Sequence, residues 1–141
     1  MYISEIAAFS QEDREADVCV SDGTFTVMCY AYPVDSVCLG QEIPAVFSYG
    51  CRDVVRDDEH TFCIKKLPPY YAYSITAQVL SRQERSVQIG KLSIWLDAPM
   101  PADISDGDFV SFSVVRLDTQ GTIPPRGFGT NTSASAILPI A

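Results

Sequence analysis

The fold class is decided by the stretch YYAYSITAQVLSR, residues 70–82. Its bulky apolar side chains fall on alternate positions, at Tyr71, Tyr73, Ile75, Ala77 and Val79. A period of two is expected of a β-strand that buries one face and leaves the other in solvent. Two stretches of the same kind follow it, RSVQIGKLSIWLD (85–97) and GDFVSFSVVRLD (107–118). Residues 70–118 therefore predict three consecutive strands.

A glycine predicts a bend or a turn in each of the two later stretches. In residues 85–97 the apolar positions change phase across Gly90, which predicts a β-bulge or a sharp bend within the strand. Residues 107–118 follow an Asp-Gly pair at Asp106 and Gly107, which is typical of a turn. The residues after it are rich in aromatic and β-branched types, which favour strands.

The rest of the chain predicts further short strands and a tail of different composition. Strands are predicted at residues 16–20, 24–32, 45–55 and 61–67, with residues 2–9 as a first strand or an entry turn. Asp22-Gly23 supplies a hairpin turn. Residues 45–55 fit either a strand bent at Gly50 or a distorted short helix, and their β-branched and aromatic residues favour the strand. Residues 119–141 are dominated by Gly, Pro, Ser and Thr, so they predict a flexible tail, or one that docks through Ile137, Leu138 and Ile140 on its own sheet edge or a neighbouring molecule's.

Together these elements predict one all-β domain over residues 1–118 and a C-terminal tail over 119–141. A chain of 141 residues is the usual size for a single domain. Six to eight short strands without a long amphipathic helix predict a small antiparallel barrel or a sandwich. The bend at Gly90 and the closing residues 101–118 resemble the OB-fold-like small barrels. That resemblance implies a fold and no activity, because such barrels host unrelated functions.

Charge and cysteine usage restrict the function classes. The chain carries 18 acidic and 10 basic residues, a net charge of -8, which repels phosphate backbones and anionic membrane surfaces and attracts a basic protein partner. No apolar run is long enough for a membrane span, and the N-terminus lacks the basic start of a signal peptide. The five cysteines form no CxxC pair, so zinc and redox templates fail and free thiols in a reducing cytoplasm are expected.

Three more specific functions have some support in the sequence and some evidence against them. Single-stranded nucleic-acid binding would use aromatic residues near basic ones, namely Tyr70, Tyr71, Tyr73 and Trp95 beside Lys65, Lys66, Arg82, Arg85 and Lys91, but the net charge opposes it. Carboxylates at 57–59 with His60, or in DISDGD (103–108), suggest a metal site, yet they lack the ligand order of an EF-hand. His60 is the single histidine and no catalytic motif accompanies it, so no enzyme, metal or cofactor is expected.

The acidic residues themselves are the remaining candidate site. They gather at residues 12–17, 53–59 and 97–108. If two such clusters meet on one face, they would bind a basic protein and set its orientation. The predicted partner-binding residues are Asp53, Asp57, Asp58, Glu59, Asp103, Asp106 and Asp108. The sequence thus predicts a non-enzymatic, acidic protein-binding module, in its concrete form an inhibitor or immunity-type protein; the alternatives are a single-strand nucleic-acid binder and a structural subunit that assembles through its tail.

Overall fold

The computed structural model describes residues 1–8, 12, 14–122 and 137–138. In this part of the chain the structure is built from strands, with one short 3-10 turn, η1 (Val34–Ser36). The strands are β1 (Tyr2–Ala8), β2 (Ala16–Ser21), β3 (Thr26–Ala31), β4 (Val46–Tyr49), β5 (Arg52–Asp57), β6 (Cys63–Lys66), β7 (Tyr73–Ser81), β8 (Ser86–Ile89), β9 (Leu92–Trp95), β10 (Phe109–Val114), β11 (Arg116–Asp118), β12 (Gly121–Thr122) and β13 (Ile137–Leu138). The all-β prediction is confirmed.

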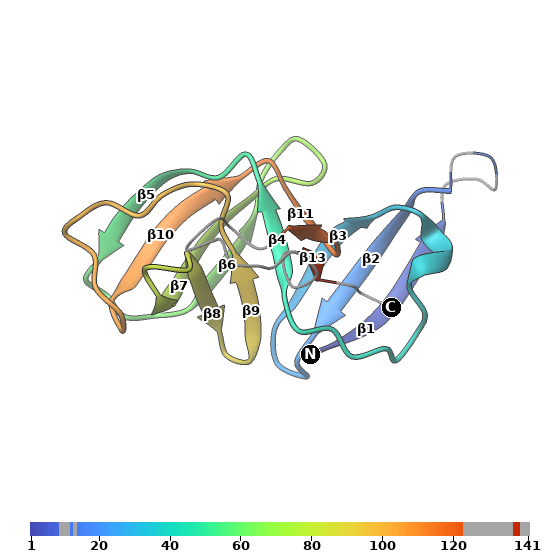
Figure 1. Cartoon of the computed structure of the whole chain (residues 1–141), viewed down its shortest axis with the longest axis horizontal. Helices are drawn as coiled ribbons and strands as arrows, with labels where there is room; N and C mark the ends of the chain where they lie inside the picture. Colours follow the sequence, from blue (N-terminus) through green and yellow to red (C-terminus); the bar gives the residue numbers. More distant parts are fainter. Residues whose placement is uncertain (9–11, 13, 123–136, 139–141) are drawn as a thin grey trace.

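Eleven of these strands form one continuous mixed sheet, in the order β1-β2-β3-β11-β4-β9-β8-β7-β10-β5, with β6 paired to β7. The pairs β3–β11 and β4–β9 are parallel, and the other pairs are antiparallel. The order begins at β1 and ends at β5, so the sheet is open. The prediction of a closed antiparallel barrel is therefore wrong, and a pair of separate sheets does not describe this order either. Figure 1 shows β1–β3 at one end of the elongated molecule, β5 and β10 at the other, and β4 and β11 between them.

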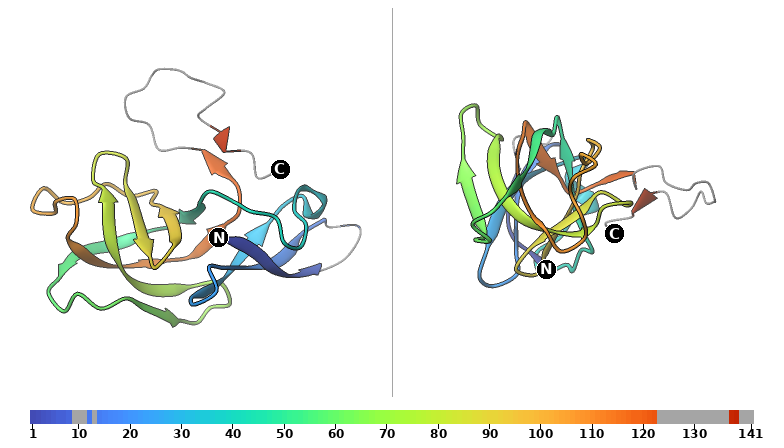
Figure 2. Two further views of the ribbon diagram at one scale, coloured as in Figure 1. Left: turned by 90° about the horizontal axis from the view of Figure 1, so that it is seen from below. Right: turned by 90° about the vertical axis from the view of Figure 1, so that its left-hand side faces the viewer.

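The sheet curls strongly (Figure 2). β4 with β5, and β10 with β11, act as two long strands that bend at neighbouring positions. Only Gly50 and Cys51 separate β4 from β5, and only Val115 separates β10 from β11. Gly50 has φ +72°, and the N–H of Val115 donates to the carbonyl of Tyr49 at 2.9 Å. The prediction of a strand bent at Gly50 is thus confirmed.

Asp97 explains why the curled sheet stays open at this point. β4 pairs with β9 only through Val46 and Phe47. Beyond β9, the carboxylate of Asp97 accepts hydrogen bonds from the backbone N–H groups of Gly50 and Cys51 at 2.8 and 3.0 Å. A side chain therefore takes the amides that a continuing strand would use, and β5 has no partner on that side within the described chain.

Gly90 lies in a turn and not in a bulge. β8 ends at Ile89, β9 begins at Leu92, and these two residues pair across an antiparallel hairpin. The prediction of a single bent strand over 85–97 is therefore wrong. Gly90 has φ +57°, and a Cβ there would lie 2.7 Å from the Asp22 carboxylate, which accepts the N–H of Lys91. By contrast, the predicted hairpin at Asp22-Gly23 is confirmed, because it joins the antiparallel strands β2 and β3.

The three N-terminal strands form a meander that joins the rest of the sheet through few contacts. β3 pairs with β11 in parallel at Tyr30 and Asp118, and the N–H of Thr119 donates to the carbonyl of Tyr30 at 3.0 Å. The N–H of Met28 donates to the hydroxyl of Tyr73 at 2.8 Å. One apolar core nevertheless runs through both parts, from Val18 and Val27 in the meander to Ile75, Val110 and Leu117.

The C-terminal segment is described only at two short strands. β12 and β13 pair with each other, Gly121 opposite Leu138 and Thr122 opposite Ile137. Residues 123–136 and 139–141, including Ile140, lie outside the described residues. Docking of the tail on a sheet edge and assembly through it remain predictions.

We predict that G50A destabilises the protein because two costs coincide there. The new Cβ would lie 2.5 Å from Cγ2 of Val115, and the backbone is left-handed. Overpacking and strain together should lower the free energy of unfolding by about 2–4 kcal/mol. The matched control is G107A, at φ +91° with open space around it, which should cost only about 1 kcal/mol. If urea unfolding shows that G50A and G107A lower the free energy of unfolding equally, the close contact of residue 50 with Val115 is contradicted.

We also predict that D97N flattens the acid limb of the stability profile. Burial raises the pKa of Asp97, but donations from the Ser48 hydroxyl and the Cys51 and Gly50 amides outweigh it and hold the pKa below its ordinary value. The ionised carboxylate therefore stabilises the fold above its unfolded pKa, and this contribution is lost as the pH falls through the folded pKa. Unfolding measured between neutral and acidic pH should depend less on pH in D97N. A variant with an unchanged slope would show that Asp97 does not couple protonation to folding.

Candidate functional site

The excess of negative charge is concentrated in the first third of the chain. Residues 1–44 contain eight acidic residues and a single basic one, Arg14, whereas residues 45–141 contain ten acidic and nine basic residues. The structure places residues 1–44 in the meander, in η1 and in the connection to β4. The acidic character of this protein is therefore a property of one end of the molecule.

A hollow of about 400 Å³ opens on the outer face of the meander. It exists there because β2 alternates buried Val18 and Val20 with outward-facing Asp17 and Cys19. We call it the acidic hollow; its lining residues are Ser4, Glu5, Ile6, Ala7, Asp17, Cys19, Met28 and Leu39.

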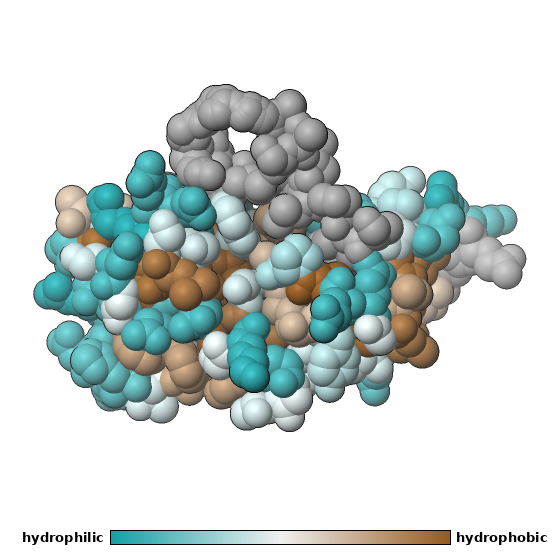
Figure 3. Space-filling model, turned by 60° about the horizontal axis from the view of Figure 1, so that its bottom comes forward, coloured by the Kyte–Doolittle hydropathy of each residue, from teal (hydrophilic) through white to brown (hydrophobic). Residues whose placement is uncertain are grey.

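The register of the meander brings the carboxylates and the apolar groups of the acidic hollow together. Glu5 lies opposite Cys19, and Cys19 lies opposite Met28, so the three side chains form one row across the sheet. Leu39, which is 66% exposed, supplies apolar surface from the connection to β4. Figure 3 shows exposed apolar surface among hydrophilic atoms at the end of the molecule where the meander lies (right). An apolar lining with carboxylates suits a cation on a hydrocarbon stem, such as lysine or arginine.

The thiol in the hollow is a poor nucleophile. The Sγ of Cys19 donates to Oε1 of Glu5 at 3.6 Å. Burial raises the pKa of Cys19, and the hydrogen bond to Glu5 raises it further, so the thiol stays protonated at neutral pH. Cys19 therefore contributes lining surface and one weak hydrogen bond to the hollow.

Tyrosine hydroxyls, two from the segment before β7 and one from β3, donate hydrogen bonds to carboxylates of the meander. Tyr70 and Tyr71, which immediately precede β7, both donate to Asp17, Tyr71 at 2.6 Å. Tyr30 donates to Glu15 at 2.9 Å, and its ring meets that of Tyr71 edge to face at 6.0 Å between centroids. Burial and the bond to Asp17 together raise the pKa of Tyr71, so it remains a donor at all physiological pH values.

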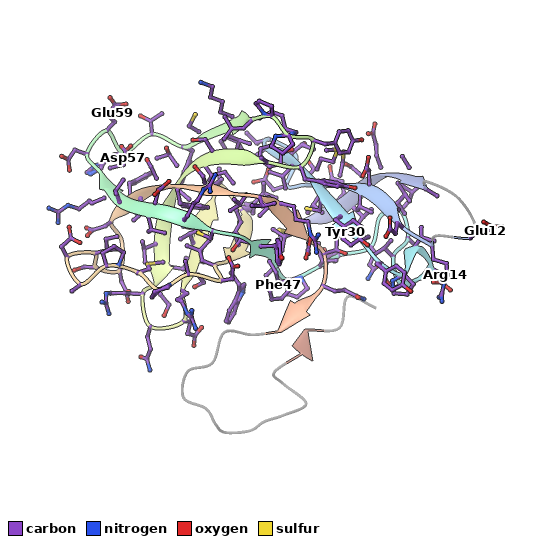
Figure 4. All side chains as sticks on the ribbon, turned by 90° about the horizontal axis from the view of Figure 1, so that it is seen from above. Glu12, Arg14, Tyr30, Phe47, Asp57 and Glu59 are labelled. Atoms are coloured by element: carbon purple, nitrogen blue, oxygen red, sulfur yellow. The ribbon has the colours of Figure 1, made fainter. Side chains whose placement is uncertain are left out.

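The predicted partner-binding residues lie at the opposite end of the molecule. Figure 4 shows Asp57 and Glu59 there, far from Glu12 and Arg14. Pairing of β5 with β10 puts Asp57 opposite Phe109, and Arg56 donates to the carbonyl of Asp103 at 3.2 Å. The end of β5 at residues 56–57 thus lies beside residues 103 and 109.

Three of those seven carboxylates have structural tasks. Asp57 accepts the N–H of Glu59 and the hydroxyl of Ser111, Asp106 accepts the N–H of Arg82, and Asp108 accepts the N–H of Ser105. The other four side chains, Asp53, Asp58, Glu59 and Asp103, are exposed. Arg56 and Arg82 lie among these carboxylates, because Arg56 donates to the carbonyl of Asp103 and the N–H of Arg82 donates to Asp106, so the charge here is mixed. Whether these seven residues bind a partner stays a prediction.

Sequence reasoning missed the acidic hollow. It noted Asp17 within the acidic cluster 12–17 but not Glu5, Met28 or Leu39. The one available signal was the ratio of eight acidic residues to one basic residue in residues 1–44. The hollow itself depends on a strand register that no local pattern reveals.

Other predicted sites look different in three dimensions. His60 stacks on Phe109, with ring centroids 5.1 Å apart, in an exposed turn. No group of three or more His, Cys, Asp or Glu side chains that could hold a metal ion occurs within the described residues. Tyr70 and Tyr71 contact a carboxylate, which disfavours a role as stacking platforms beside phosphates.

None of the described residues forms a helix long and apolar enough to cross a membrane.

Comparison with known proteins gave no match: no family model, no curated protein and no solved structure is significantly similar to this chain. No relative therefore supports the OB-like resemblance or supplies a function.

We predict that D17N shifts the titration of two tyrosines. The bond to Asp17 is the main reason that the pKa of Tyr70 is raised, and it adds to burial at Tyr71. Removing the negative charge should lower the pKa values of both tyrosines. The pKa of Tyr71 should stay above its ordinary value, because burial also raises it. Tyrosinate absorbance followed against pH, with circular dichroism to confirm folding, measures the change. D58N, at the other end of the molecule, is the control; identical curves for D17N and the unaltered protein would contradict the contacts.

Proposed function

We propose that this protein is an acidic binding module that captures a basic segment of a partner protein at the meander. The observation that carries the proposal is the acidic hollow, in which Glu5 and Asp17 lie beside the apolar groups of Met28 and Leu39. A lysine or arginine side chain matches this lining, because its stem is apolar and its head is cationic.

The charge distribution supports the same partner. Eight acidic residues against one basic residue in residues 1–44 create a negative field over the end that carries the hollow. Such a field accelerates encounter with a cationic surface and orients it before contact. An inhibitor or immunity-type protein, which occludes the basic site of a nuclease or another nucleic-acid-binding protein, is the specific form of this function that we propose.

The hollow is a better candidate than the acidic residues at the opposite end. At residues 53–59 and 103–108, three of the seven carboxylates already accept bonds from within the protein, and arginines lie among them. At the hollow, the side chain of Glu5 is exposed, and among the described residues its hydrogen-bond partner is a weak thiol donor. Asp17 also accepts two internal bonds, from Tyr70 and Tyr71, but these fix the carboxylate at the hollow, so little conformational entropy is lost when a ligand binds.

Fluorescence anisotropy with a labelled lysine-rich peptide tests the proposal. The double variant E5Q/D17N should weaken binding about tenfold, since two carboxylates that contact a desolvated cation are lost. The matched control D58N/E59Q removes the same charge at the opposite end and should weaken binding by less than about twofold.

The other outcomes of that titration are informative. Equal weakening by both double variants would mean that only the overall field attracts the peptide. A larger effect of D58N/E59Q would assign binding to residues 53–59. Binding that is insensitive to added salt would contradict the electrostatic basis, and tight binding of a single-stranded oligonucleotide at low salt would favour the nucleic-acid alternative.

A further inference from the structure

The first strand is one end of the sheet order, and only part of its free edge is covered. The N–H of Ile3 donates to the carbonyl of Gln41 at 2.9 Å, and its carbonyl accepts the N–H of Gly40 at 2.8 Å. The N–H of Ile43 donates to the carbonyl of Met1 at 3.1 Å. The connection to β4 therefore covers β1 from residue 1 to residue 3.

The pairing register shows which later groups of β1 face the free edge. The backbone N–H and C=O groups of Ile3 both bond to the connection to β4, so they point away from β2. Ile3 and Val20 are therefore a pair of facing residues without hydrogen bonds between them. Such pairs alternate along an antiparallel ladder, so Val18 belongs to the next one. A bulge between Ile3 and Glu5 shifts β1 by one residue, which makes Ile6 the partner of Val18.

The N–H and C=O groups of Ile6 therefore point away from β2, and by the same alternation so do those of Ala8, opposite Ala16. Within the described part of the chain, no hydrogen bond from another segment reaches these four groups. Their unpaired donors and acceptors are the template that an additional strand needs.

The two edge strands, β1 and β5, differ in whether their side chains prevent pairing with an added strand. β5 exposes Arg52, Asp53 and Arg56, and charged side chains protect an edge. Residues 6–8 of β1 read Ile-Ala-Ala, with neither charge nor proline. The edge of β1 is thus open to pairing, and it borders the acidic hollow, because Glu5, Ile6 and Ala7 belong to both.

We propose that residues 6–8 of β1 accept an extended basic segment of a partner protein as an added β-strand, whose cationic side chains enter the acidic hollow. This inference rests on the proposed function and specifies its geometry. Side chains of an added strand alternate between faces, so those beside Glu5 and Ala7 reach the hollow and those beside Ile6 meet the core side. The preferred ligand alternates lysine or arginine with apolar β-branched residues.

A basic segment of a partner fits the edge of β1 better than two other strands, one from a second copy of the chain and one from the C-terminal segment. A second copy of the chain would bring its own residues 1–44, with eight acidic residues and one basic residue, against the same region of the first copy, so like charges would repel. The described strands of the C-terminal segment, β12 and β13, already pair with each other.

Amide hydrogen exchange in the full chain, with the alternating peptide KVKVKVK as probe, tests the geometry. The amides of Ile6 and Ala8 should exchange at least about tenfold more slowly in the complex, because they gain hydrogen bonds. The amide of Ala7, which faces β2, should change little. Unchanged exchange at Ile6 and Ala8 with the peptide bound would overturn strand addition.

Binding measurements separate this inference from the proposed function. The block peptide KKKKVVV has the same composition and should bind at least fivefold more weakly than KVKVKVK. A8P should weaken binding of the alternating peptide while preserving the fold, because proline removes an N–H that only the added strand would use. Equal binding of both peptides, unaffected by A8P, would overturn strand addition and leave basic-segment capture standing; no binding of either peptide would overturn both.

Discussion

The arrangement of the candidate site depends on how Arg116 joins the meander to the rest of the sheet. The guanidinium lies between the rings of Tyr30 and Tyr49, 4.7 and 4.6 Å from their centroids, and pairs with Asp118 at 2.7 Å. Tyr30 belongs to β3 and Tyr49 to β4, so one cation links the meander to the bent strand beside it. Cation–π contacts gain strength when they are partly shielded from water, and this cation is only one-third exposed. Because the parallel ladder between β3 and β11 is so short, this contact and the Tyr73 hydroxyl at Met28 fix the orientation of the meander.

That orientation has a direct consequence for the acidic hollow. Tyr70 and Tyr71 come from the segment before β7, yet their hydroxyls reach Asp17 on β2. Two hydroxyl donors hold the Asp17 carboxylate in position, while the exposed Glu5 beside it can adjust to a ligand. The hollow therefore combines one fixed and one adaptable carboxylate, which is a suitable arrangement for recognising a cation of variable reach.

Local patterns in the sequence predicted the strands well, and the arrangement of the strands poorly. The alternation from Tyr73 to Val79 is a property of one segment, so it identified β7 correctly. A glycine with positive φ fits a bulge or a turn equally, so the Gly90 prediction failed: the choice depends on whether Ile89 and Leu92 pair. The parallel pairs β3–β11 and β4–β9 join segments far apart in the sequence, and no residue pattern announces them. The hollow was missed for the same reason, since the row from Glu5 through Cys19 to Met28 exists only once three strands are in register.

The carboxylates of this protein divide into two groups, so net charge alone overstates the surface that is free to bind. Asp22 accepts hydrogen bonds from the backbone amides of Thr24, Phe25 and Lys91. Asp57 accepts the amide of Glu59, and Asp97 accepts the amides of Gly50 and Cys51. The pKa values of all three lie below their ordinary range, because these donations outweigh the burial that opposes them. Such carboxylates stabilise the native backbone at neutral pH and have few acceptor sites left for a ligand. Glu5 belongs to the other group: within the described residues its hydrogen-bond partner is a thiol, it lies in a hollow with apolar walls, and the amides of the neighbouring strand edge have no partner. We propose that this combination of exposure, apolar surroundings and an adjacent strand edge makes Glu5 a binding group; among the described residues the combination occurs at β1.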